Sequence, residues 1–222
     1  MQTEVQNLRD ETVRLSNEIT SATDTLRDLH DAGIERVYSQ RGGKALVREW
    51  IDLARDAVEI DLLGFTMYHE WLYYEELKAA LVTVAGRPGG AVRILVLPPL
   101  PAATDQEPEL TEANLNYLVR RRQPGEDRGH VLRGYLESAH DSLAELQDEA
   151  ADTQLEVRCL HACMPYCMLV RIDSYMYVAP YLASAQGEDS FAMTVRGPSD
   201  LSDLFKLYSQ EFEAMWKAED RS

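Results

Sequence analysis

The chain has 222 residues, of which 45% are hydrophobic and 27% charged, as in ordinary soluble globular proteins. This length is enough for one well-buried domain with an appendage. Its 22 basic and 38 acidic side chains give a formal net charge of −16. That charge disfavours nucleic acid and anionic membrane as partners, because both attract positively charged surfaces.

The sequence also bears on the compartment. No run of apolar residues is long enough to cross a bilayer, and the polar N-terminal segment lacks the apolar core of a signal peptide. The three cysteines are an odd number and lie close together, unlike those of a secreted disulfide scaffold. We therefore expect a cytoplasmic protein that does not contact a membrane.

The N-terminal segment carries a heptad pattern. Its a and d positions are Val5, Leu8, Thr12, Leu15, Ile19, Ala22, Leu26 and Leu29, spaced alternately by three and four residues. We predict that residues 1–32 form a coiled-coil stalk that holds a homodimer, and that Gly33 ends the helix. The alternative is an amphipathic helix that lies across its own domain.

Residues 33–222 are predicted to form one α/β domain. Apolar runs and alternating patterns predict strands at 34–38, 58–65, 91–97, 155–160, 167–172, 175–180 and 190–195. Helical patterns cover 44–57, 70–85, 131–150 and 199–217, and a further helix is expected to end at about Arg122. The early alternation of strand and helix predicts a mixed, mainly parallel sheet flanked by helices.

Several stretches resemble one known family in order along the chain. The runs ALVREWIDLARDAVEIDLLGF and GGAVRILVLPP resemble the opening half of a phospholipase D-type domain. The stretch LEVRCLHACMPYCMLVRIDSYMYVAPY resembles its catalytic hairpin, and FKLYSQEFEAMW its terminal helix. The resemblance spans residues 34–217 and implies a phospholipase D-like fold.

The catalytic signature of that family, His-x-Lys followed after four residues by Asp, is absent. Aligning its Asp with Asp173 puts Tyr166 at the nucleophile and Met168 at the phosphate-binding lysine. Starting from His161 instead puts Cys163 at the lysine position. The resemblance therefore implies a pseudoenzyme. It also requires that the sheet bring the Asp173 hairpin and the segment after Leu63 to the same edge.

A ligand site is predicted where polar side chains follow the strands. Ligands of open α/β sheets bind beyond the carboxyl ends of the strands, and an arginine there could bind an anionic group. The predicted ligand-binding residues are Arg41, Thr66, Tyr68, His69, Tyr166 and Asp173. The alternative is an ordinary loop with a surface histidine.

A second candidate site gathers every cysteine of the chain within nine residues. Its members are Cys159, His161, Cys163 and Cys167. Thiolates and imidazoles are zinc ligands, so the cluster could hold zinc or sense redox state. Its spacing lacks the usual Cys-x-x-Cys element, and structural packing is the favoured interpretation, with no cofactor.

Three functional hypotheses follow. The first is a non-catalytic, homodimeric sensor or regulatory module that binds either a small ligand or a protein partner. The small ligand could be anionic, because Arg41 supplies a positive charge. The second is a divergent phosphodiesterase or nuclease that uses His69 or His161. The third is an interaction protein that docks through the aromatic run containing Trp71. The missing catalytic signature favours a function other than catalysis.

Overall fold

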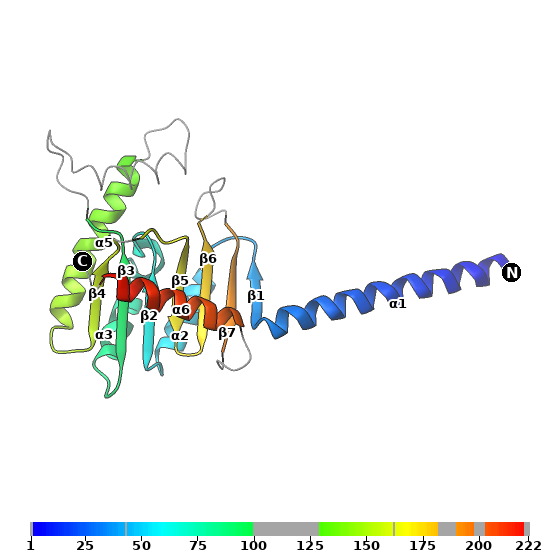
Figure 1. Cartoon of the computed structure of the whole chain (residues 1–222), viewed down its shortest axis with the longest axis horizontal. Helices are drawn as coiled ribbons and strands as arrows, with labels where there is room; N and C mark the ends of the chain where they lie inside the picture. Colours follow the sequence, from blue (N-terminus) through cyan, green and yellow to red (C-terminus); the bar gives the residue numbers. More distant parts are fainter. Residues whose placement is uncertain are drawn as a thin grey trace.

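The computed structural model describes residues 2–42, 44–99, 129–161, 163–181, 190–197 and 203–219 (Figure 1). The helix predicted to end at about Arg122 lies outside these ranges. Within them the chain is a mixed α/β protein with a seven-stranded sheet. None of the helices in the described ranges is long and apolar enough to cross a membrane.

The N-terminal helix α1, Gln2–Asp31, leaves the rest of the molecule instead of packing on it. Figure 1 shows it projecting sideways from the sheet edge formed by strand β1, Ile34–Tyr38. Its 30 residues span about 45 Å at 1.5 Å per residue. The alternative of a helix lying across its own domain is therefore wrong.

The remaining elements follow the predicted order closely. The strands are β2 (Glu59–Leu63), β3 (Ala91–Val96), β4 (Leu155–Cys159), β5 (Cys167–Ile172), β6 (Tyr175–Pro180) and β7 (Ala192–Arg196). The helices are α2 (Lys44–Ala54), the π-helix η1 (Tyr68–Leu72), α3 (Glu75–Ala85), α5 (Gly129–Glu149) and α6 (Asp203–Ala218). The single predicted helix at 70–85 is thus two elements.

The sheet order is β1-β7-β6-β5-β2-β3-β4, and most neighbours are antiparallel. Only the β2–β3 and β3–β4 pairs are parallel, whereas β2–β5, β5–β6, β6–β7 and β7–β1 are antiparallel. The prediction of a mainly parallel sheet is wrong. The β5–β6 hairpin is inserted beside β2, which separates β1 from β2 and adds antiparallel pairs.

Helices cover both faces of the sheet, and each face has its own apolar core. On one face α2, α3 and α5 pack against alternate strand residues such as Ile60, Val92 and Met168. On the other face α6 packs against Leu63 and Leu95 through Phe212 and Trp216. Every strand of the centre is therefore buried on both sides.

The chain connects the strands differently at the two ends of the sheet, that is, at the two ends of its strands. At the end where β2 finishes, β1, β3, β4 and β6 finish as well, and the chain leaves each of these strands in a loop (Figure 1). At the opposite end the chain turns tightly, as between β5 and β6 and between α3 and β3. Binding groups concentrate on loops that a rigid scaffold positions, so the loop-rich edge is the natural place for a site.

Candidate functional site

The segment that follows β2 is held in an unusual conformation. A Cβ atom on Gly64 would lie 2.6 Å from the Met67 sulfur and 3.1 Å from the Tyr181 hydroxyl, so the chain passes closely here. The Phe65 amide donates to that hydroxyl over 3.1 Å. Met67 has a left-handed backbone with φ 52° and opens the π-helix η1. Single π-turns occur frequently at functional sites.

Arg41 contacts this segment although three strands, β7, β6 and β5, separate β1 from β2. It follows β1, yet its guanidinium pairs with Glu70 of η1 and donates to the Met168 sulfur over 3.0 Å. The guanidinium also lies 5.3 Å from the centre of the Tyr181 ring. Burial lowers the pKa of Arg41, but the charges of Glu70, Tyr181 and Tyr177 and the hydrogen bond to Glu70 together outweigh it, so the pKa is raised.

Sequence reasoning missed the polar surroundings of Arg41. Within the described part of the chain, the buried donors Arg41 Nε and Trp71 Nε1 have no protein hydrogen-bond partner. Trp50 stacks on Trp71 at 5.6 Å and meets Tyr177 edge-on at 5.3 Å. Buried polar groups of this kind are normally satisfied, by water if not by protein.

Three of the predicted residues lie together beside this cluster. Thr66 accepts a hydrogen bond from the Tyr68 amide over 3.3 Å, which shapes the start of η1. The His69 ring is exposed and meets Tyr135 of α5 edge-on at 4.3 Å. Tyr68 stacks on the same tyrosine at 6.4 Å. The predicted group of Thr66, Tyr68 and His69 is thus brought together with Arg41 at one edge.

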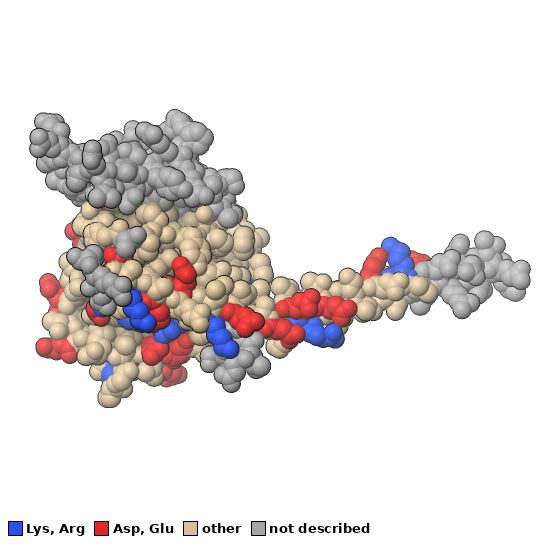
Figure 2. Space-filling model, viewed as in Figure 1, with Lys and Arg blue, Asp and Glu red and all other residues tan. Residues whose placement is uncertain are grey.

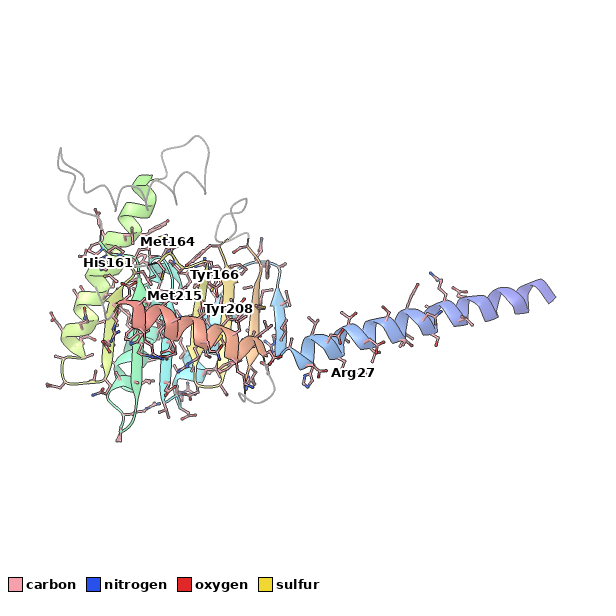
Figure 3. All side chains as sticks on the ribbon, viewed as in Figure 1. Arg27, His161, Met164, Tyr166, Tyr208 and Met215 are labelled. Atoms are coloured by element: carbon pink, nitrogen blue, oxygen red, sulfur yellow. The ribbon has the colours of Figure 1, made fainter. Side chains whose placement is uncertain are left out.

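Tyr166 lies at the same edge but on the α6 side of the sheet (Figure 3). Its carbonyl accepts from the Tyr181 amide over 2.8 Å, which ties the segment before β5 to the segment after β6. Its side chain is only half-buried, yet desolvation raises the pKa of its phenol. Tyr208 of α6 adds to this shift and is labelled near it in Figure 3.

Asp173 does not belong to the site. In the antiparallel pairing of β2 with β5, Ile60 faces Ile172 and Leu63 faces Leu169, so the hairpin after Ile172 lies at the amino end of β2. Its carboxylate there accepts from the Val58 amide over 3.0 Å and the Glu59 amide over 2.8 Å. The expectation that Asp173 shares an edge with the segment after Leu63 is wrong.

The cysteine cluster is also spread out. Cys159 ends β4 and Cys167 begins β5, and β2 and β3 lie between these strands. Three strand spacings of about 4.8 Å separate the two strands by about 14 Å, too far for one metal ion. The His161 amide donates to Glu219 over 3.1 Å. Among the residues that the structure describes, no group of three or more possible ligands is arranged to hold a metal.

The thiols themselves are poorly suited to metal binding or redox sensing. All three are free, and burial raises the pKa of each. For Cys167 burial and the charge of Glu211 raise the pKa to about 12, although Arg41 acts in the opposite direction. Because the thiolate is the reactive and ligating form, these cysteines are held in the inert state at neutral pH.

Comparisons with known proteins identify no family. No family model matches the chain, and no curated protein matches it. A solved structure of TrmBL2, an archaeal chromatin protein reported to show a novel mode of DNA binding, matches with a TM-score of 0.47 and 16% sequence identity. The match covers 95% of this chain and 66% of the TrmBL2 chain, so this chain spans less than two thirds of that protein's length.

Two predictions are corrected by these findings. No family model supports a phospholipase D-type domain, and the Asp173 hairpin lies at the opposite end of β2 from the segment after Leu63, so the family assignment and the pseudoenzyme derived from it are wrong. The exclusion of nucleic acid is withdrawn as well, because the similar structure belongs to a protein that binds DNA. The likeness is too distant to assign DNA binding to this chain.

Proposed function

We propose that the chain is a homodimeric regulatory module. In this proposal α1 holds two copies together, and the loop-rich edge around Arg41 binds a small anionic ligand or a protein partner. The observation that carries the proposal is the path of α1, which leaves the domain with its apolar stripe uncovered. The proposal does not depend on the withdrawn family assignment.

The stripe is costly to leave in water. Its described large members are Leu15, Ile19, Leu26 and Leu29, and two of them, Ile19 and Leu26, are 66% and 67% exposed. Burying eight such side chains in a dimer contributes about 12 kcal/mol at about 1.5 kcal/mol each. Association itself costs about 4–15 kcal/mol. The gain and the cost are of similar size, so we expect a dimer whose population depends on concentration.

The charges on α1 are compatible with this use. Figure 2 shows acidic and basic side chains lying beside each other in clusters along the helix, with uncharged surface between the clusters. Arg14 bridges Glu11 at 4.0 Å and Glu18 at 3.4 Å, and Arg27 pairs with Asp24 at 3.1 Å. These pairs lie within one helix, which leaves the stripe free to meet a second apolar surface.

The ligand half of the proposal rests on the edge around Arg41. A cation there is held by one carboxylate, so an incoming anion can compete with Glu70 for the guanidinium. Arg41 Nε and Trp71 Nε1 are buried donors without a protein partner, which suits an acceptor-rich ligand. An exchange of Glu70 for a ligand would release η1 from Arg41 and so alter the surface beside α5.

The dimer is tested by sedimentation of the full chain with a charge placed on the stripe. The Ile19→Glu, Leu26→Glu double variant should sediment as a monomer at concentrations where the unchanged chain is a dimer. Val13→Glu is the matched control, because Val13 is an exposed apolar residue outside the a and d positions. If the unchanged chain is still monomeric at about 100 micromolar, on the order of the Kd of a weak dimer, the proposal is refuted.

The ligand edge is tested by thermal unfolding with inorganic phosphate or citrate added. Ligands that bind only the folded state raise the Tm. The unchanged chain should show such a rise, and the Arg41→Met, Glu70→Met double variant should lose it while keeping both buried volumes filled. A rise of equal size in the double variant would show that the anion binds elsewhere.

A further inference from the structure

The residue types of the seam are those of a parallel pair of helices. Val5, Thr12 and Ile19 are β-branched and take a positions, whereas Leu8, Leu15 and Leu29 take d positions. In parallel coiled coils, β-branched residues at a with leucine at d favour two strands, so the seam fits a parallel dimer. Three of the four layers of each kind obey this rule, with Leu26 and Ala22 as the exceptions.

The flanking charges favour the same orientation. Glu11 and Glu18 occupy g positions, and the e positions opposite them in a parallel dimer are Ser16 and Thr23, which carry no charge. In an antiparallel dimer g positions face g positions, so glutamates of the two chains would approach each other. Like charges so placed destabilise the pairing, which disfavours the antiparallel form.

The junction between α1 and β1 makes the orientation matter for the domains. The Gly33 amide donates to the His30 carbonyl over 2.8 Å, and the Gly33 carbonyl accepts from the Arg196 amide over 3.0 Å. Gly33 has φ 81°, a left-handed conformation that ends the helix. The two-residue link is therefore bonded to the helix on one side and to β7 on the other, and it fixes the direction in which the stalk leaves the sheet.

We infer that two copies of this chain form a parallel, in-register coiled coil, which places both α/β domains at the same end of the stalk. The inference rests on the proposed dimer and adds its geometry. The seam is weak at Thr12 and Ala22, so a second contact between the two copies would stabilise the dimer. A parallel arrangement supplies one, because it brings together the two β1 edges, where Val37 is exposed on the outermost strand.

Disulfide trapping separates the two orientations. In the parallel form the two copies of residue 26 share one layer. In the antiparallel form each layer pairs two residues whose numbers add to 34, so residue 26 lies beside residue 8 of the partner. The two copies of residue 26 are then 18 residues, or about 27 Å, apart along the stalk. Leu26→Cys, in a chain whose three native cysteines are replaced by serine, should therefore form disulfide-linked dimers on mild oxidation.

Two controls accompany this variant. Asp24→Cys should not cross-link, because residue 24 faces away from the seam. In the parallel form its two copies lie at the same height along the stalk, as the two copies of residue 26 do. A mixture of Leu26→Cys and Leu8→Cys chains should form the mixed disulfide only in the antiparallel form. Cross-linking confined to that mixture, with a dimer by sedimentation, would overturn the parallel inference and leave the proposed dimer standing. No cross-link together with a monomer would overturn both.

Discussion

The most informative perturbation of the fold is the removal of one buried charge beneath α6. Asp61 of β2 is 2% exposed and lies between arginines of the two neighbouring strands. Arg93 of β3 donates to both its oxygens, over 2.8 and 3.0 Å, and Arg171 of β5 pairs with it at 2.9 Å. The carboxylate thus balances two guanidinium groups at the centre of the sheet.

The cost of Asp61→Asn follows from what the arginines retain. Removing one member of a buried ion pair costs about 3–5 kcal/mol, because a charge stays behind unpaired. Arg93 keeps Glu213 at 2.7 Å and Arg171 keeps Glu59 at 2.5 Å, so neither is left without a carboxylate. We therefore expect the lower end, about 3 kcal/mol. With a urea slope of about 2–3 kcal/mol/M, the midpoint should fall by about 1–1.5 M.

The assay is urea unfolding followed by circular dichroism at one fixed protein concentration, because a dimer makes stability depend on concentration. Asp52→Asn is the matched control, since Asp52 pairs with Arg55 at 3.2 Å with both side chains largely exposed. That variant should lie within about 0.5 kcal/mol of the unchanged chain. If Asp61→Asn also stays within that margin, the buried network does not stabilise the sheet as argued.

Three further predictions concern other parts of the molecule. Gly90→Ala should lower stability by several kcal/mol, on the order of the largest single-site effects, because its Cβ would lie 1.9 Å from the Val84 carbonyl oxygen. The hydrogen bond from Arg93 lowers the pKa of Glu213, so it stabilises the fold above the ordinary glutamate pKa and that contribution is lost as pH falls; Glu213→Gln should flatten the acid limb of a stability–pH curve. Cys167, whose pKa is raised to about 12 by burial, should resist thiol reagents at pH 8 until the chain unfolds.

Each of these has its own contrary result. Gly134→Ala should be neutral or slightly stabilising, since nothing lies within 4 Å of its added Cβ and alanine favours helix; equal losses at both glycines would refute the steric argument. An unchanged acid limb in Glu213→Gln would show that its pair with Arg93 has no net effect. Labelling of Cys167 at the rate of a free thiol in native protein would show that burial does not protect it.

Local patterns in the sequence predicted the elements well, because they depend on neighbouring residues. Cys167–Ile172 and Tyr175–Pro180 have their predicted bounds, and Asp173 between them takes φ 49°, as a tight turn requires. What could not be predicted is which strand lies beside which. Pairing of β5 with β2 joins residues more than 100 positions apart, and no local pattern encodes that choice.

The same difference explains the errors at the candidate site. Thr66, Tyr68 and His69 follow one strand, so their common location was predictable from strand and loop alone. Asp173 was misplaced because its edge depends on the direction of β5 relative to β2, which is antiparallel. Glu70 looked like an ordinary acidic residue at a helix start. Its pair with Arg41 joins segments that only the complete sheet brings together.

The stalk and the Arg41 edge are joined by a single short strand. Two residues separate the end of α1 from the start of β1, and Arg41 lies three residues after the end of β1. β1 pairs only with β7, and the register between them shifts near Glu35. A movement of β1 against β7 would therefore couple the ligand to the dimer. A ligand that frees Arg41 from Glu70 without disturbing the β1–β7 pairing should leave the dimer unchanged.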